Sequence, residues 1–189
     1  ATRKPLINAG DGAGQHPTQA LLDLYTIRKE RGGVDGLTVL LAGDLKHGRT
    51  VHSLALLLSL FDVRFIFASP PPLRMPREIV DRLRSASIPV EESDDIAESL
   101  DSADVLYMTR IQQERFSSPQ EYERLKGSYV LTRSLLRQGK DALTLMHPLP
   151  RVDEIAPEVD LLPGAAYFRQ SANGVPVRMA LLALLSGEL

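Results

Sequence analysis

The stretch LTVLLAGDLKHGRTVHSLALLLSLFDVRFIFA, residues 37–68, decides the fold class of this chain. Residues 37–42 and 63–68 are short apolar runs rich in strand-forming side chains, and the helix-like segment VHSLALLLSLF lies between them. Two strands connected through a helix pair in parallel within one sheet. Because these strands are apolar along almost their whole length, we expect both faces of the sheet to be covered.

The same alternation continues on both sides of this stretch and predicts a three-layer α/β fold with a parallel sheet. Further strands are predicted at residues 104–108 and 142–146, with a short strand near Val90. Helices are predicted at residues 16–31, 77–87, 94–100, 119–126 and 176–185, with a short element at 133–138.

Composition sets limits on the class of protein. The 189 residues are 43% hydrophobic, so we expect a buried core and no extensive disorder. The net charge of -2 gives no indication of a basic surface for binding nucleic acid or membranes. The chain has no cysteine, which excludes disulfides, thiolate metal sites and cysteine nucleophiles. The amino-terminal stretch lacks the apolar run of a secretory signal, and the longest apolar run, residues 179–185, is too short to span a bilayer. We therefore expect a cytoplasmic protein.

Arginines recur in the loops after successive predicted strands: Arg49, Arg74, Arg110, Arg115 and Arg151. The carboxyl ends of parallel strands meet at one edge of a sheet, where ligands bind. Guanidinium groups at that edge suit bidentate binding of carboxylate or phosphate. Solvated loop arginines are the alternative interpretation, and the recurrence after successive strands favours an anion site.

Two glycine-rich loops resemble nucleotide-binding patterns without satisfying them. In residues 43–50, Arg49 stands where a phosphate-binding loop has Lys, and the strand that follows does not end in an Asp for magnesium. Residues 10–14, GDGAG, follow no convincing strand. We expect the 43–50 loop and Arg49 to bind a different anion at the start of a helix.

The four histidines have no mutual spacing that predicts a metal site, and no cofactor is expected. His52 lies inside a predicted helix and is expected to be structural. His16 precedes Pro17 at a helix start, where backbone amides and the helix dipole favour developing negative charge. An ordinary helix-capping role for His16 is the alternative.

The segment HPLPR, residues 147–151, has prolines on both sides of Leu149. This makes the backbone stiff and keeps the carbonyls of Pro148 and Leu149 out of a regular ladder. Fixed carbonyls suit a substrate amine, although the segment could also be only a rigid loop.

Five motifs in this order resemble the aspartate carbamoyltransferase family: HPTQALLDLYTI, GDLKHGRTVHSL, LYMTRIQQERF, MHPLPRVDEI, and AAYFRQSANG followed by VRMALLALL. The resemblance runs from about Pro5 to Leu185 and is closest to the versions fused into multifunctional pyrimidine-synthesis polypeptides of animals and fungi. It implies a Rossmann-like domain. It also implies transfer of the carbamoyl group of carbamoyl phosphate to aspartate, giving carbamoyl aspartate and phosphate in de novo pyrimidine (UMP) synthesis, without metal or organic cofactor.

The resemblance also implies roles for individual residues. His16 and Gln19 would contact the carbamoyl group, with His16 at the carbonyl oxygen, where negative charge builds in the transition state. Arg49 and Arg110 would bind the aspartate carboxylates, with Gln112 beside them.

The remaining implied roles concern substrate orientation and domain closure. The carbonyls of Pro148 and Leu149 would orient the carbamoyl group or the attacking amine. Lys46, Glu114 and Arg115 would have closure or interface roles. The related ornithine enzymes typically carry HPCQ and HCLP, whereas this chain has HPTQ and HPLP, which favours aspartate as the acceptor.

The resemblance predicts how the chain is organised. Residues 1–33 would form an interdomain helix region carrying HPTQ, residues 34–170 the aspartate-binding Rossmann-like domain, and residues 171–189 a C-terminal interdomain helix. In the family, a carbamoyl-phosphate domain bears a Ser-Thr-Arg-Thr motif and most homotrimer contacts. That motif does not occur in these 189 residues, and we expect this domain to be absent from them. We therefore expect the chain to be inactive alone and part of a larger enzyme. The alternative is a binding or assembly module that has lost catalysis.

Overall fold

The fold is built on one fully parallel five-stranded sheet. The computed structural model describes residues 4–12, 14–111, 116, 118–127 and 129–187. The strands are β1 (Leu37–Ala42), β2 (Val63–Ala68), β3 (Val90–Ser93), β4 (Val105–Met108) and β5 (Thr144–Met146). Their order is β3-β2-β1-β4-β5, with every pairing parallel, which confirms the predicted α/β class. In this Rossmann-like order the chain reverses direction across the sheet between β1 and β4, where ligands bind.

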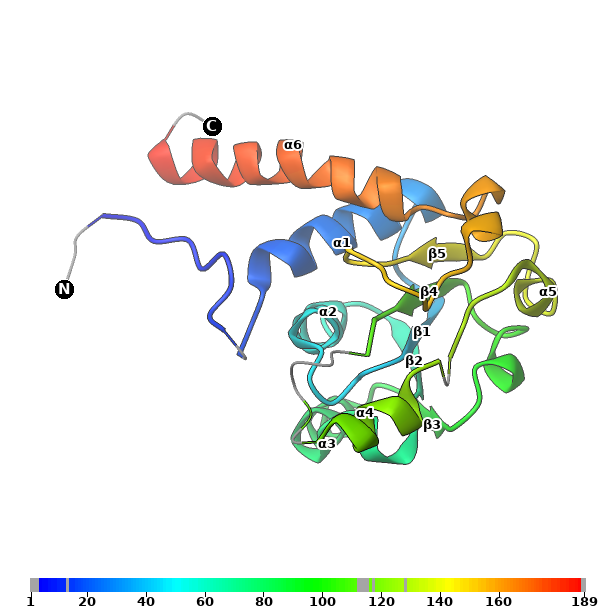
Figure 1. Cartoon of the computed structure of the whole chain (residues 1–189). Helices are drawn as coiled ribbons and strands as arrows, with labels where there is room; N and C mark the ends of the chain where they lie inside the picture. The colour runs from blue at the N-terminus through cyan, green and yellow to red at the C-terminus, as the bar shows by residue number, and fades with distance from the viewer. Residues whose placement is uncertain (1–3, 13, 112–115, 117, 128, 188–189) are drawn as a thin grey trace.

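Helices cover the sheet and extend beyond it (Figure 1). They are α1 (Pro17–Arg31), α2 (Arg49–Leu58), α3 (Arg77–Ser85), α4 (Pro119–Leu125), α5 (Arg133–Leu136) and α6 (Tyr167–Ser186), with 3-10 turns at Pro71–Leu73, Ala97–Ser99 and Pro157–Leu161. In the described part of the chain, no helix combines the length and hydropathy needed to cross a membrane.

Two predicted helices differ from the structure. Residues 94–100 form only the 3-10 turn Ala97–Ser99, because Asp95 Oδ1 accepts the Ala97 amide at 2.8 Å and the Ser93 hydroxyl accepts the Asp95 amide at 3.0 Å. Such local side-chain bonds compete with helix formation. The helix predicted at residues 176–185 is the second half of α6, which starts at Tyr167 and continues through Pro176.

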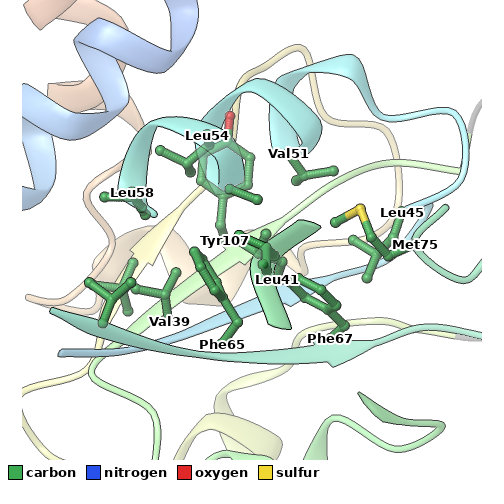
Figure 2. Packing of buried hydrophobic residues seen from close by; sticks show 14 of the residues in the cluster. Val39, Leu41, Leu45, Val51, Leu54, Leu58, Phe65, Phe67, Met75 and Tyr107 are labelled. Carbon is green, nitrogen blue, oxygen red and sulfur yellow. The ribbon is translucent and has the colours of Figure 1, made fainter. Parts of the chain in front are cut away.

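The core lies on both faces of the sheet because successive strand residues point to opposite sides. In β1, Val39 and Leu41 join one apolar cluster while Leu40 and Ala42 join the other. Figure 2 shows the first cluster between the sheet and α2, with the hydroxyl group of Tyr107 pointing away from the strands. The second cluster is closed by short helices and loops, including the turns at Ala97–Ser99 and Pro157–Leu161.

Helices α1 and α6 lie side by side (Figure 1). They are joined by Asn173 Nδ2, which donates to Thr26 Oγ1 at 3.0 Å, and by a two-bond ion pair between Arg169 and Glu30 at 2.7 and 2.8 Å. Several apolar side chains of the two helices remain outside this contact and line a groove: Leu21, Tyr25, Pro176, Val177, Ala180, Leu181 and Leu184. The two helices thus pack together and still expose an apolar surface.

Candidate functional site

A cleft opens at the carboxyl ends of β1, β4 and β5, beside the start of α1. It is lined by His16, Gln19, His47, Gly48, Arg49, Thr50, Thr109, Arg110, His147, Pro148, Leu149 and Pro150. Its volume of about 200 Å³ suits a small metabolite better than a nucleotide or a peptide. No acidic side chain is among the described residues that line it. The cleft therefore favours an anionic ligand.

The cleft brings together six of the ten residues predicted for the site: His16, Gln19, Arg49, Arg110, Pro148 and Leu149. Lys46 lies in the same β1–α2 loop and is exposed, but it does not line the cleft. Gln112, Glu114 and Arg115 lie outside the described residues.

A close approach of two loops forms the floor. Gly43 has a φ of +102°, and a Cβ atom there would lie 2.2 Å from the carbonyl oxygen of Thr109, so a side chain has no room. The Thr109 hydroxyl donates to the carbonyl of Ala42 at 3.1 Å. The loop after β1 is thereby held against the end of β4, which places the side chains of Arg49 and Arg110 on one cleft.

Arg49 is the first residue of α2, and a tight turn before it sets its position. Asp44 is fully buried and accepts the His47 amide at 3.0 Å, and its carboxylate pairs with His47 Nδ1 at 3.1 Å. Arg49 Nη1 donates to the carbonyl of Gly12 at 2.7 Å, which ties the amino-terminal loop to the cleft. A guanidinium group at a helix start strengthens the attraction for an anion.

His16 stands immediately before α1, and its imidazole does not cap the helix. Its backbone amide donates to Ser53 Oγ at 2.8 Å, while its buried Nδ1 has no partner among the described residues. Burial lowers the pKa of His16, and the positive charges of Arg49 and Arg178 lower it further. The ring is therefore neutral near pH 7 and can donate one hydrogen bond into the cleft.

The HPLP loop is held by a buried pair that the sequence analysis missed. The Leu149 amide donates to His147 Nδ1 at 2.9 Å, so the ring proton is on Nε2, which donates to Glu154 Oε1 at 2.7 Å. Glu154 Oε2 also accepts the amides of Val152 and Asp153 at 3.1 and 3.2 Å. These bonds give Pro148 and Leu149 a fixed place at the cleft.

Asp23 is a further buried residue that the sequence did not predict. It is fully buried in α1 and accepts hydrogen bonds from Gln19, Tyr107 and Gln170. Burial raises its pKa to about 7, although these bonds oppose the shift. Its position four residues after Gln19, between leucines, was the available signal.

Two of the arginines predicted for the anion site at the sheet edge, Arg74 and Arg151, lie elsewhere. Arg74 pairs with Asp94 at 2.6 Å, and Arg151 forms a two-bond ion pair with Asp160, one bond being 2.6 Å. Neither lines the cleft. The prediction that five arginines meet at one anion site is wrong for these two, because the spacing of arginines along the chain does not reveal their acidic partners.

The other histidine predictions concern structure and metal binding. His52 Nε2 donates to the carbonyl of Leu45 at 2.7 Å, in agreement with a structural role. Within residues 4–12, 14–111, 116, 118–127 and 129–187, no group of three or more His, Asp or Glu side chains is placed to hold a metal ion.

The fold and the cleft define a class: a Rossmann-like α/β protein with a cleft suited to a small anionic ligand at the carboxyl ends of its strands. The chain belongs to the aspartate/ornithine carbamoyltransferase family. Residues 35–185 match the Asp/Orn binding domain of that family, and residues 1–29 match its carbamoyl-P binding domain.

Individual relatives agree with this assignment. The chain is 57% identical to the multifunctional protein CAD of Squalus acanthias over 99% of this chain and 8% of the relative. It is also 57% identical to the aspartate carbamoyltransferase catalytic subunit of Thermococcus onnurineus, over 98% of this chain and 60% of the relative. The chain thus spans less than two thirds of these relatives.

Solved structures agree as well. The aspartate transcarbamoylase catalytic subunit of M. jannaschii is 52% identical, with a TM-score of 0.88 over 95% of this chain and 58% of that one. The aspartate transcarbamoylase of Trypanosoma cruzi in complex with aspartate and phosphate is 41% identical, with a TM-score of 0.85 over 95% of this chain and 57% of that one.

Proposed function

We propose that this chain is the aspartate-binding part of an aspartate carbamoyltransferase. The complete enzyme would transfer the carbamoyl group of carbamoyl phosphate to L-aspartate, giving N-carbamoyl-L-aspartate and phosphate in pyrimidine synthesis. One observation carries the proposal: a cleft joins Arg49 and Arg110 to His16, Gln19 and the HPLP loop, and none of the described residues that line it is acidic. The similarity to a solved enzyme with bound aspartate and phosphate supports the same assignment.

The two arginines suit an acceptor with two carboxylates. Arg49 and Arg110 come from different loops, so each can bind one carboxylate of aspartate through its planar donors. Ornithine has one carboxylate and a cationic side chain, which this lining would repel. With both carboxylates held, the α-amino group would be directed to the carbonyls of Pro148 and Leu149.

His16 and Gln19 would act on the carbamoyl group. As the amine nitrogen attacks the carbamoyl carbon, negative charge builds on the carbamoyl oxygen, and the neutral imidazole of His16 can donate a hydrogen bond to it. The new C–N bond forms as the C–O bond to phosphate breaks. In the proposed reaction the leaving phosphate accepts the amine proton. The rate gain would then come from orientation and charge stabilisation, without an enzyme nucleophile.

The cleft would need a second domain to work. We propose that a carbamoyl-phosphate-binding domain packs on the apolar groove of α1 and α6, in a homotrimeric cytoplasmic enzyme, with Lys46, Glu114 and Arg115 in closure or interface roles. The exposed groove and the 60% span of the archaeal relative support this proposal. The predicted ranges 1–33, 34–170 and 171–189 remain our proposal for the domain organisation, although α6 itself starts at Tyr167.

Product formation tests the proposal. The chain alone is compared with a completed subunit, in which the carbamoyl-phosphate-binding domain of the Thermococcus onnurineus relative precedes this chain. We expect carbamoyl aspartate from the completed subunit only, and no comparable product with ornithine. Steady-state turnover by the chain alone would contradict its predicted dependence on a second domain. A completed, folded subunit that carbamoylates ornithine better than aspartate would overturn the substrate assignment.

A further inference from the structure

Asp23 connects three elements beneath the cleft. Its Oδ1 accepts from Gln19 Nε2, one turn earlier in α1, at 2.9 Å and from Gln170 Nε2 of α6 at 2.6 Å. Its Oδ2 accepts from the Tyr107 hydroxyl of β4 at 2.9 Å. The Asp23 side chain is fully buried, so solvent does not compete for these bonds.

The network has a defined polarity. Because the Asp23 oxygens accept, the side-chain amides of Gln19 and Gln170 turn their NH₂ ends toward them. The oxygen end of the Gln170 amide then accepts the backbone N–H of His147, at the start of the HPLP loop, at 2.8 Å. In Gln19, which lines the cleft, the carbonyl end is left for a ligand.

We propose that Asp23 is a positioning residue that fixes the Gln19 amide and, through Gln170, the HPLP loop in one arrangement. Asp23 does not line the cleft and touches no substrate there. It fixes the orientation of the Gln19 and Gln170 side-chain amides, so that their NH₂ groups face Asp23 and their oxygens face the cleft and His147, respectively. The expected effect of Asp23 on carbamoyl transfer rests on the proposed function, whereas its effect on the arrangement of Gln19 and the HPLP loop does not.

The variant Asp23→Asn tests this polarity at nearly constant volume. An Asn side chain presents one oxygen and one NH₂ group, so three donors can no longer all be accepted. If the Gln170 amide rotates in response, its NH₂ group faces the His147 N–H. Two donors then face each other, and the hydrogen bond from His147 to Gln170 is lost. The matched control is Thr26→Val, because Thr26 also makes a buried α1–α6 hydrogen bond, with Asn173, and its hydrogen-bond partners Leu22 and Asn173 are not those of Asp23.

Nuclear magnetic resonance of the chain itself gives the structural readout. Asp23→Asn should shift the side-chain amide signals of Gln19 and Gln170 and the backbone amide signals of His147 and Leu149. Thr26→Val should leave these four signals in place. Unchanged signals in folded Asp23→Asn, or equal shifts in both variants, would overturn the inference.

Kinetics of the completed subunit give the second readout. A misplaced carbamoyl-contacting group should lower kcat for carbamoyl transfer by about 10- to 100-fold, with aspartate KM changing less than about 3-fold. Thr26→Val should keep kcat within about 3-fold of the unmodified subunit. Equal loss of kcat in both variants would show that Asp23 acts only on stability. An inactive unmodified subunit would count against the proposed function, and the resonance signals would still decide the role of Asp23.

Gln170→Leu keeps the inference testable if Asp23→Asn does not fold. This variant removes the hydrogen bonds of Gln170 with Asp23 and His147 and keeps Asp23 as the acceptor for Gln19. It should shift the His147 and Leu149 amide signals, lower kcat, and shift the Gln19 signals less than Asp23→Asn does. Unchanged loop signals and an unchanged kcat would overturn the proposed link.

Discussion

His147 Nε2 lies 2.7 Å from Glu154 Oε1, and both side chains are almost completely buried behind the HPLP loop. Burial opposes the charged form of Glu154, but the hydrogen bonds from His147 and from loop amides outweigh it, so the pKa of Glu154 lies below its usual value. The Glu154 carboxylate therefore fixes both the proton on His147 and the path of the loop that lines the cleft.

Replacing Glu154 should destabilise the chain through this loop. Glu154→Ala leaves the His147 Nε2–H and two backbone amides without their acceptor, which should lower the free energy of unfolding by about 1–3 kcal/mol. Glu154→Gln keeps one oxygen and should cost less. Urea denaturation measures both, with the exposed Glu123→Ala as control. Equal stability of Glu154→Ala and the control would contradict this account of the loop.

Asp23 should make stability depend on pH. Its pKa of about 7 in the folded state lies above the value of about 3.9 expected in the unfolded chain, so the folded state binds more protons between these values. Stability from this group is complete below about pH 4 and is lost as the pH rises through 7. The difference in unfolding free energy between the unmodified chain and Asp23→Asn should therefore fall from pH 4 to pH 7. A constant difference would show that Asp23 does not titrate there.

His16 should titrate below an ordinary histidine. Burial and the charges of Arg49 and Arg178 disfavour its protonated ring. Imidazole signals followed against pH should place the His16 midpoint below 6.5, and Arg49→Gln should move it upward. A midpoint above 6.5 would contradict the neutral donor assigned to His16.

Substitution of Arg49 or Arg110, which line the cleft, should weaken aspartate binding, whereas substitution of Arg74 should not. Arg49→Lys and Arg110→Lys keep the positive charge but lose planar two-bond binding of a carboxylate, which should raise aspartate KM in the completed subunit by about 10- to 100-fold. Arg74→Lys is the matched control, because Arg74 pairs with Asp94 outside the cleft. Steady-state kinetics would contradict the assignment if all three variants behaved alike.

The fold could be predicted from the sequence because its signals are local. The apolar runs of β1 and β2 on both sides of α2 are explained by burial on two faces, and Leu37–Ala42 and Val63–Ala68 appear with the predicted bounds. The helix predicted at residues 94–100 does not form, because the side-chain oxygens of Ser93 and Asp95 accept backbone amides and so compete with a helix.

The spacing of residues alone predicted the part of the site that lies in loops after strands, whereas the resemblance to the family added the roles of His16 and Gln19 at the start of α1. Arg49 and Arg110 share a cleft because parallel strands end at one edge, whereas Arg74 and Arg151 are held by acidic residues that their spacing did not indicate. Asp23 was missed because its partners Tyr107 and Gln170 lie 84 and 147 residues away along the chain. Hydrogen bonds between residues so far apart in the sequence depend on how α1, β4 and α6 pack together.

A crystal structure of the completed subunit with aspartate and phosphate tests the central claim most directly. The account predicts both aspartate carboxylates within hydrogen-bonding distance of Arg49 and Arg110, with the amino group facing the carbonyls of Pro148 and Leu149. Aspartate bound outside this cleft, or held there without either arginine, would contradict the account.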